Sequence, residues 1–383
     1  MIEPRDILGP EGAIARRLAA YEHRPQQLEM AEAITRALAA QSTLLVEAGT
    51  GVGKSFAYLL PAIQRICDHD ERVIVATNTI NLQEQLLEKD IPLPNAVVPD
   101  EFTAVLVKGR GNYVSLRRLE RASARQDVLF PNGVSRTSLH VLEDWASSTA
   151  DGSLSSLDEP PRPEVWDHAR SDAHNCMGRQ CPLHDKCFYQ AARRRMTHGD
   201  LLITNHALFF ADLALRTQGV GFLPAYDHVI LDEAHGVADT AAEHFGLSIS
   251  EGRVGHLLRV LHHPSRHKGY LASLAVGQSA VALVDSTIEQ VLACHERSSR
   301  QFQGVSDWLQ RDAPENGRMV RPELIDDVLR GALLRLSDML RELREEVLHD
   351  EDAFELNSYA QRTRELGRSL DHLLRQTIDG CVY

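Results

Sequence analysis

The chain has 383 residues, and its 41 Lys and Arg against 54 Asp and Glu give a formal net charge of −13. This balance excludes a protein that coats nucleic acid by bulk positive charge, although a local basic groove can exist on an acidic body. Hydrophobic residues make up 43% and no apolar run reaches the ~18 residues of a membrane helix. The first residues hold no apolar segment like a signal peptide, so we expect a cytoplasmic protein without a membrane partner.

The first elements alternate between helix and strand. Apolar residues at helical spacing predict a helix over 25–40, and a short apolar strand follows at 43–46. A second helix is expected over about 56–68, a buried strand over 72–76 and a third helix over about 82–89. Such alternation is typical of a parallel α/β sheet.

The rest of the chain departs from this alternation. Residues 110–200 are rich in Arg, dotted with Pro and expected to be irregular. Strands return at 201–204 and 228–231, and residues 246–375 are expected to be mostly helical. The acidic stretch 341–352 predicts a solvated helix face.

The turn between the first strand and the second helix is typical of a phosphate-binding loop. Glycines let backbone N–H groups converge on phosphate oxygens, and the N-terminus of the following helix assists them. Lys54 would reach the β- and γ-phosphates, and the Ser55 hydroxyl would bind Mg²⁺. The predicted nucleotide-binding residues of this loop are Ala48, Gly49, Thr50, Gly51, Val52, Gly53, Lys54 and Ser55.

The strand at 228–231 ends in two carboxylates, Asp232 and Glu233, and His235 follows them. At the carboxyl end of a buried strand, Asp232 can hold Mg²⁺ and Glu233 can polarise an attacking water. His235 is either a surface histidine or a link from the nucleotide to other elements, and an acidic turn is the alternative for the pair. Because Asp232 and Lys54 would serve one Mg²⁺, the long segment between them must leave the sheet and return.

The order of these motifs resembles the superfamily 2 helicases, and in detail the DinG/XPD-like iron–sulfur DNA helicases. This resemblance extends from about residue 8 to the end of the chain, and it implies a RecA-like domain that binds ATP and Mg²⁺. It also implies hydrolysis coupled to 5′→3′ movement on single-stranded or forked DNA, with a role in DNA repair. The stretches that carry it are 21–27, 47–55, 76–86, 108–113, 204–208 and 232–235.

The resemblance also implies roles for residues outside the phosphate loop. Gln27 would read the adenine, and its alternative is a polar helix residue. Thr77, Asn78 and Thr79 would contact the DNA backbone, since small polar groups at a strand end suit phosphate contacts. The alternative for this loop is a plain turn in which Asn81 caps the next helix.

Basic residues gather at both ends of the irregular segment, although the whole chain is acidic. They would line a groove that tracks DNA phosphates, with Lys108, Arg110 and Tyr113 as the expected contacts. The alternatives are basic helix faces paired with acidic segments, and core packing for the tyrosine. The basic residues are Lys108, Arg110, Arg117, Arg118, Arg121, Arg125, Arg193, Arg194 and Arg195.

Three cysteines share one short stretch with spacing typical of a metal site: Cys176, Cys181 and Cys187. They match the last three ligands of the family's [4Fe–4S] cluster, but Ser115 occupies the position of the first. The resemblance implies a cluster in which Ser115 or a nearby histidine is the fourth ligand. A labile or incomplete cluster, a zinc site with His174 or His184, and an empty relic are the alternatives.

The inferences combine into three parts. We expect an ATP-binding RecA-like domain at 1–107, 200–245 and 376–383, an iron–sulfur insertion at 108–199 and a helical arch-like insertion at 246–375. The family's motor needs a second RecA-like domain, which no segment here resembles. We therefore expect the N-terminal half of a helicase, completed downstream or in trans. The alternatives are a nucleotide- and DNA-binding half-motor without turnover, and the ATPase module of a nuclease.

Overall fold

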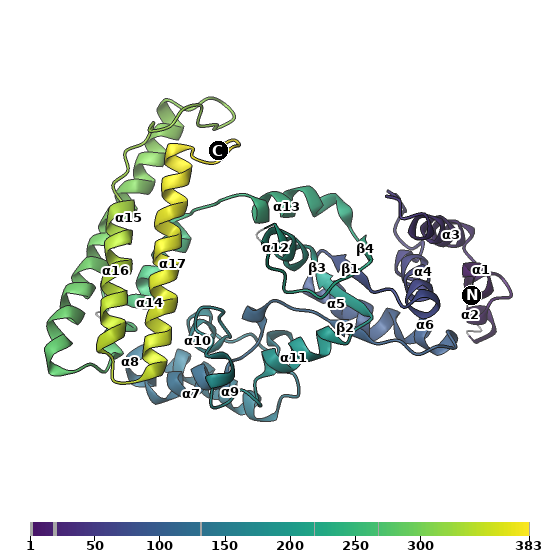
Figure 1. Ribbon diagram of the computed structural model, residues 1–383, viewed down its shortest axis with the longest axis horizontal. Coiled ribbons are helices and arrows are strands. Elements are labelled where there is room, and N and C mark those ends of the chain that lie inside the picture. The colour runs from purple at the N-terminus through teal and green to yellow at the C-terminus, as the bar shows by residue number, and fades with distance from the viewer. Residues whose placement is uncertain (1–2, 18–20, 131, 218, 267, 383) are drawn as a thin grey trace. The chain divides into compact units, whose positions relative to one another are not determined.

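The computed structural model describes residues 3–17, 21–130, 132–217, 219–266 and 268–382. The chain divides into two compact units, each formed by two stretches of sequence (Figure 1). Unit 1 comprises Met1–Gly109 and Gln190–Gly246, and unit 2 comprises Arg110–Tyr189 and Leu247–Tyr383. Within the described ranges, no helix has both the length and the hydropathy that crossing a membrane requires.

The described residues of unit 1 form a four-stranded sheet in the order β2-β3-β1-β4. All neighbouring strands are parallel, which confirms the predicted parallel α/β sheet. Strand β1 is buried over its whole length, as expected for a parallel strand covered on both faces. The strands are β1 (Val73–Thr77), β2 (Ala104–Leu106), β3 (Leu201–Asn205) and β4 (His228–Leu231).

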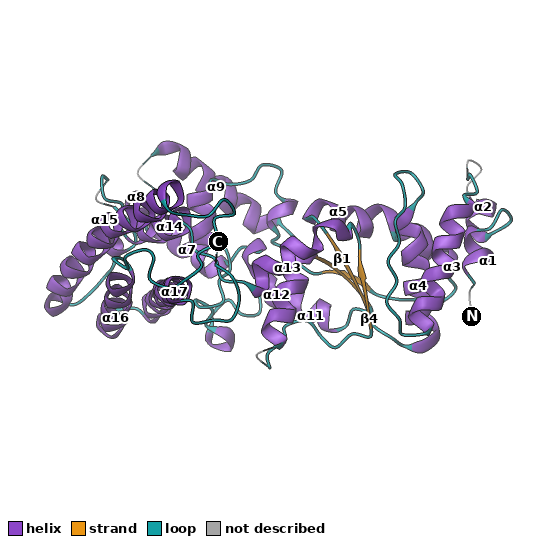
Figure 2. Ribbon diagram, turned by 90° about the horizontal axis from the view of Figure 1, so that it is seen from above, coloured by secondary structure: helices purple, strands orange, loops and turns teal. Residues whose placement is uncertain are grey.

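Helices cover both faces of this sheet (Figure 2). Alternate residues of β1 point to opposite faces: Val73 and Val75 pack with α4, whereas Ile74 and Ala76 pack with α12. The helices on the first face include α1 (Pro4–Leu8), α3 (Pro25–Ala39), α4 (Lys54–His69) and α6 (Pro92–Val97). The other face packs against α11 (Phe188–Thr197), α12 (His206–Arg216) and α13 (Val237–Phe245).

The prediction of a strand at 43–46 is wrong. These residues belong to no strand, and Leu45 is 86% exposed. A strand needs a hydrogen-bonded neighbour, and β4 pairs with β1 alone in the sheet of described residues. Among the described residues, no strand pairs with this apolar run.

The helix predicted after β1 is present but changes character along its length. It begins as α5 (Ile80–Gln85) and continues as the π-helix η1 (Leu86–Asp90). A π-helix accommodates an extra residue per turn, and such segments occur frequently at functional sites. The direction of the side chains at its end is therefore not given by ordinary helical spacing.

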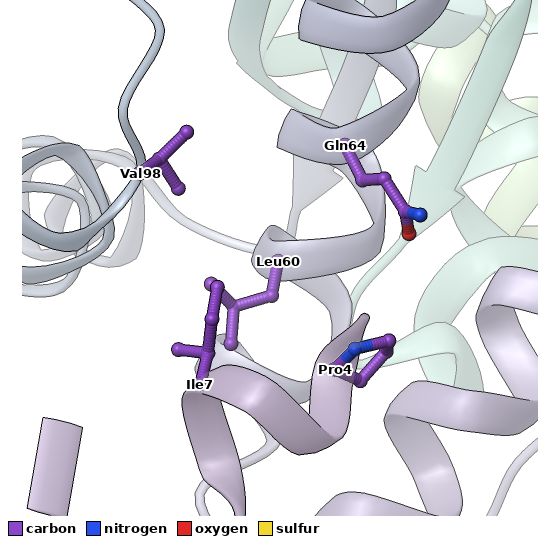
Figure 3. A pocket seen from close by; sticks show the side chains of 5 residues that line it. All are labelled: Pro4, Ile7, Leu60, Gln64 and Val98. Carbon is purple, nitrogen blue, oxygen red and sulfur yellow. The ribbon is translucent and has the colours of Figure 1, made fainter. Parts of the chain in front are cut away.

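A small pocket in unit 1 lies where α1 approaches α4 (Figure 3). Its lining residues are Pro4, Ile7, Leu60, Gln64 and Val98. None of them is predicted to bind a nucleotide, a metal or DNA, and most are apolar. The pocket therefore belongs to the packing of the N-terminal helices rather than to the site.

Most described residues of unit 2 lie in helices. The segment expected to be irregular forms helices around its own core. That expectation is therefore wrong in part, since residues 149–162 and 170–187 lie in no α-helix. The helices around this core are α7 (Leu116–Ala124), α8 (Gln126–Leu129), α9 (Gly133–Ser148) and α10 (Pro163–Ala169). The mostly helical prediction for 246–375 is confirmed by α14 (Glu251–Leu261), α15 (Val281–Arg311), α16 (Arg330–Glu346) and α17 (Asp350–Arg375). Helices α15, α16 and α17 lie side by side (Figure 1).

The segment expected to return to the sheet at 376–383 lies in unit 2 in this structure. Gln376 donates a hydrogen bond from Nε2 to the Met319 carbonyl oxygen at 2.8 Å. The Met319 N–H donates to the Val382 carbonyl at 2.8 Å. Tyr383 lies outside the described residues, so 376–382 is held by the helical unit as far as it is described.

Candidate nucleotide site and charged surfaces

The carboxyl ends of the parallel strands bring distant residues together. The Asp232 N–H donates to the Ala76 carbonyl at 2.8 Å, and His206 Nε2 lies 3.1 Å from the same oxygen. The residues after β1, β3 and β4 therefore meet at one edge of the sheet. In open α/β sheets, this is the edge at which ligands bind.

The phosphate loop enters α4 through two glycines in the left-handed region, Gly51 with φ 83° and Gly53 with φ 85°. A Cβ atom on Gly53 would lie 2.1 Å from Gln27 Nε2, so only glycine fits there. No side chain caps the start of α4 at Lys54. Its first N–H groups are therefore available to an anion such as a phosphate.

Two side chains from the start of α3 hold the phosphate loop from outside. Gln27, which is 5% exposed, donates from Nε2 to the Gly53 carbonyl at 2.9 Å. Arg24 donates from Nη1 to the Gly51 carbonyl at 2.6 Å. Sequence reasoning gave Arg24 no role, although its position directly before the helix offered a signal. Adenine reading by Gln27 stays a prediction.

The structure brings the predicted Lys54 and Glu233 into contact. Lys54 Nζ lies 3.2 Å from Glu233 Oε1, and both side chains are about one third exposed, at 32% and 35%. Glu233 has φ 53° and ψ 48°, a left-handed conformation that costs a residue with a Cβ atom free energy. His235 Nδ1 lies 3.4 Å from Glu233 Oε2, but its side chain is 75% exposed. The motif therefore places the carboxylate of a residue with a strained backbone against the phosphate-loop lysine.

The carboxyl of Asp232 has a raised pKa. Burial is the main cause, the charge of Glu233 adds to it, and the charge of Lys54 opposes it. A carboxylate that is destabilised in this way is suited to a divalent cation, which would restore the charged form. Two buried oxygens nearby, the Tyr58 hydroxyl and Asp90 Oδ2, have no hydrogen-bond partner among the described residues. The residues present therefore fit a hydrated Mg²⁺, and sequence reasoning missed both Tyr58 and Asp90.

The loop predicted to contact DNA backbone has three different side-chain environments. Thr77 is fully buried, Asn78 is exposed, and the Thr79 hydroxyl accepts a hydrogen bond from the Leu82 N–H at 3.3 Å. Thr79 therefore caps α5, and the alternative in which Asn81 is the cap is wrong. Contact of this loop with DNA stays a prediction, with Asn78 as its exposed side chain.

The other predicted DNA-binding residues make contacts within the protein. In unit 1, Lys108 Nζ lies 2.8 Å from Glu84 Oε1, and the lysine side chain is 4% exposed. In unit 2, the Arg110 guanidinium stacks over the Tyr189 ring at 4.0 Å. Tyr113 is also 4% exposed and packs against the same ring, which agrees with the core-packing alternative. Their binding to DNA stays a prediction.

Arginines of α7 and of the residue that follows it contact carboxylates of α17 in a group that we call the arginine–carboxylate cluster. Arg118 Nε lies 2.8 Å from Glu355 Oε1, and Arg125 Nη2 lies 2.7 Å from Asp352 Oδ2. Asp352 is fully buried, so the expectation of a solvated acidic face is wrong at this residue. The cluster consists of Arg118, Arg121, Arg125, Glu351, Asp352 and Glu355.

The same cluster decides between the alternatives for three of the basic residues. Burial raises the pKa of Asp352, but the hydrogen bond from Arg125 and the charges of Arg121 and Arg125 lower it below its ordinary value. Asp352 is therefore ionised and paired. For Arg118, Arg121 and Arg125, the structure agrees with basic helix faces paired with an acidic segment rather than with a free groove.

The three cysteines are not gathered around one point. Over the residues that the structure describes, no three His, Cys, Asp or Glu side chains are grouped as a metal ion requires. Burial raises the pKa of Cys176, but a hydrogen bond from Arg110 lowers it below the ordinary value. Ser115 precedes α7, and its side chain does not cap that helix. The environment of Cys176 suits a thiolate, whereas the arrangement of the predicted ligands shows no site.

Comparison with known proteins identifies the class of domain. Residues 24–127, which include the phosphate loop and β1, match the DEAD/DEAH box helicase family. The match agrees with the parallel sheet and with the pairing of Lys54 and Glu233 at its edge. Residues 24–127 are thus similar to a DEAD/DEAH box helicase domain.

Individual relatives confirm the resemblance to DinG-type helicases. The chain is 35% identical over 247 residues to the ATP-dependent DNA helicase YoaA of Escherichia coli, which covers 64% of this chain and 38% of that protein. It is 34% identical over 253 residues to the ATP-dependent helicase DinG of Mycobacterium tuberculosis, at 62% and 38% coverage. The 3′-5′ exonuclease DinG of Bacillus subtilis is 30% identical over 239 residues, with 25% of that protein covered. The chain thus spans less than two fifths of these relatives.

Proposed function

We propose that unit 1 binds ATP with Mg²⁺ and is the first motor domain of a DNA helicase, in which hydrolysis drives 5′→3′ movement on single-stranded DNA. The contact between Lys54 and Glu233 supports this proposal most directly, because it joins the phosphate loop to the acidic end of β4. The relatives named ATP-dependent DNA helicase YoaA and ATP-dependent helicase DinG support the same activity. The location that we propose is the cytoplasm.

The contacts suggest how the site would change when ATP binds. Lys54 has to release Glu233 before it can reach the β- and γ-phosphates. The released Glu233 carboxylate can then accept a proton from the attacking water. Ser55 and Asp232 would hold Mg²⁺, which neutralises charge on the phosphates when it is bound. Nucleotide binding and activation of the base would therefore be linked through one lysine.

Single-turnover ATP hydrolysis with and without single-stranded DNA tests this function. We expect hydrolysis that DNA stimulates and that Glu233→Gln lowers by about 10²- to 10⁴-fold, a typical loss for a general base. The Glu233→Gln protein should still bind ATP, and the exposed Glu88→Gln should behave as wild type. ATP binding without hydrolysis in either condition would favour the half-motor that has no turnover of its own.

The relation to the Bacillus subtilis exonuclease supports a second candidate function, the ATPase module of a nuclease. The two functions differ in what happens to the DNA. Incubation of the protein with end-labelled single-stranded DNA, ATP and Mg²⁺ separates them. Shortened DNA supports the nuclease, whereas ATP hydrolysis over intact DNA supports the helicase motor.

We also propose that Cys176, Cys181 and Cys187 bind a [4Fe–4S] cluster whose fourth ligand is Ser115 or a nearby histidine. The spacing of the cysteines, the family resemblance and the hydrogen bond from Arg110 to Cys176 support this. Purification without oxygen should give a brown protein that contains iron, and Ser115→Cys should increase its iron content. A colourless, iron-free protein in both cases would contradict the cluster and favour the relic.

The exposed loop after β1 is our proposed DNA contact in unit 1. Asn78 is exposed there, while Thr77 is buried and Thr79 caps α5. Asn78→Ala should therefore weaken binding of single-stranded DNA and leave ATP binding unchanged. Fluorescence anisotropy with a labelled oligonucleotide, at a stated salt concentration, measures the difference.

A further inference from the structure

Two buried polar groups in unit 1 have no function in the mechanism above. The Tyr58 hydroxyl and Asp90 Oδ2 make no hydrogen bond within the described part of the chain. Tyr58 is only 2% exposed, so water outside the protein cannot satisfy it. An unpartnered buried oxygen destabilises a fold, and each such group calls for a physical explanation.

The two groups come from elements that already carry the site. Tyr58 lies on α4 one turn after Lys54, on the same side of the helix. Asp90 is the last residue of the π-helix η1, which packs against α4. A π-helix at this position redirects the side chain that ends it. Both residues are thus positioned by regular structure rather than by a loop.

The neighbours of these two groups are the predicted Mg²⁺ residues. Burial raises the pKa of Tyr58, and the charge of Asp232 adds to this effect, while Ser55 opposes it. Burial also raises the pKa of Asp90, and the Ser55 hydroxyl opposes the change. Ser55 and Asp232 therefore lie within reach of the Tyr58 hydroxyl and interact with it weakly, but neither makes a hydrogen bond of full geometry with it among the described residues. Four side chains that carry oxygen atoms therefore lie near one another at the predicted Mg²⁺ site. They come from α4, from η1 and from the residue after β4, and they are Ser55, Tyr58, Asp90 and Asp232.

The charges at this place suit a hydrated divalent cation. Asp90 and Asp232 are both acidic, and Lys54 is already engaged with Glu233. Mg²⁺ dehydrates reluctantly, so it usually keeps several waters and takes one or two carboxylates. Groups that hydrogen-bond such waters orient them and strengthen binding of the metal. A hydroxyl and a carboxylate oxygen that lack partners can each hold one of these waters.

We propose that Tyr58 and Asp90 are positioning residues of the magnesium site, where they hold the waters that Mg²⁺ carries between Ser55 and Asp232. The inference rests on the proposed binding of ATP and Mg²⁺ and deepens it. It assigns no step of hydrolysis to either residue. It explains why two polar groups remain buried and unpartnered beside a phosphate-binding helix.

The test measures Mg²⁺ separately from the nucleotide. ADP binding to the purified protein is titrated in EDTA and then at increasing MgCl₂, and bound Mn²⁺ is followed by electron paramagnetic resonance. Tyr58→Phe and Asp90→Asn should bind ADP in EDTA as wild type does. In both variants, the Mg²⁺ concentration that gives half of the change in ADP affinity should be about 10- to 100-fold higher than in wild type. A shift of this size is expected for groups that orient metal ligands.

Stability and a matched control separate positioning from folding. Tyr58→Phe removes a buried oxygen that makes no hydrogen bond of full geometry among the described residues, so its melting temperature should equal or exceed that of wild type. Asp70→Asn, an exposed carboxylate at the end of the same helix, should leave the Mg²⁺ dependence unchanged. Variants with the Mg²⁺ dependence of wild type would overturn the inference alone. A wild-type protein that binds no ADP at any Mg²⁺ concentration would overturn the proposed function and this inference with it.

Discussion

The nucleotide site of unit 1 and the arginine–carboxylate cluster of unit 2 use similar residues in opposite ways. In the cluster, Asp352 is buried and accepts hydrogen bonds from Arg121, Arg125 and Tyr270. At the site, Asp232 has a raised pKa and the Tyr58 hydroxyl has no partner in the described chain. Charge that is fully paired stabilises a fold, whereas charge and polar groups left unpaired are prepared for a ligand. Whether a buried polar group is paired therefore distinguishes a structural role from a binding role, even where the residue types are the same.

The largest effect is expected from removing charge inside the cluster. Asp352→Asn leaves Arg121 and Arg125 without their buried partner, which typically costs about 3–5 kcal/mol of unfolding free energy. Thermal and urea unfolding followed by circular dichroism measure the loss. ADP binding by the folded protein should not change, since the cluster lies in unit 2.

An exposed ion pair of unit 2 provides the control for this variant. Asp338 accepts a hydrogen bond from Arg364, but its side chain is 66% exposed. Asp338→Asn should therefore cost no more than about 1 kcal/mol, as exposed pairs do. Equal losses for Asp338→Asn and Asp352→Asn would contradict the structural importance of burial in the cluster.

Lys54→Ala should give the reverse pattern, with an effect on binding and little on stability. Loss of a hydrogen bond to a charged phosphate should weaken ATP binding by about 10- to 150-fold. The contact with Glu233 is about one third exposed on each side, so its loss should hardly change the melting temperature. Calorimetric titration with ATP checks the affinity. A large fall in melting temperature with unchanged affinity would place Lys54 with the structural charges instead.

A paired carboxylate of unit 1 tests what decides whether a charged residue contributes to stability or to binding. The two possibilities are its pairing and the unit in which it lies. Glu71 accepts hydrogen bonds from Arg65 at 2.6 and 2.5 Å and lies 2.7 Å from His228 Nε2. The hydrogen bond from Arg65 is the main cause that lowers the pKa of Glu71 to about 2, against burial. Glu71→Gln should therefore lower stability by roughly 1–3 kcal/mol at neutral pH and leave ATP binding unchanged.

The stability difference between wild type and Glu71→Gln depends on pH in a definite direction. Because the folded-state pKa of Glu71 is lowered, its stabilisation is complete above the unfolded-state value of ~4.3. It is lost as the pH falls through about 2. Urea unfolding between pH 7 and pH 2 should show Glu71→Gln and wild type converging only at the acid end. A constant difference at all pH values would mean that the glutamate acts through packing.

The smallest effect concerns a residue that sequence reasoning assigned to DNA. Since the Thr79 hydroxyl caps α5, Thr79→Ala should cost about 1 kcal/mol of stability. Asn81→Ala, in the first turn of the same helix, should cost less because Asn81 is not the cap. Thermal unfolding compares the two. A loss of DNA binding in Thr79→Ala without a loss of stability would return this residue to the DNA-contact prediction.

The parts of the fold that sequence could predict are those with local causes. The phosphate loop, the buried strands and the acidic end of β4 follow from glycine spacing and apolar runs, which short segments carry themselves. The run at 43–46 was predicted wrongly because strand formation needs a neighbour that is distant in sequence. The cluster could not be predicted as a contact, since Arg118 and Glu355 are 237 positions apart. Asp90 was missed because its direction depends on a π-helix that no spacing rule indicates.

The left-handed backbone of Glu233 has a consequence for how this protein can change over generations. At φ 53° a residue with a Cβ atom gives up about 1–2 kcal/mol, and glycine is the residue that avoids this loss. Under the proposed function, a lineage that had lost ATP hydrolysis could exchange this carboxylate for glycine without harm to its fold. Purifying selection alone would then keep glutamate at position 233, and its presence in a given descendant would record whether turnover is still required.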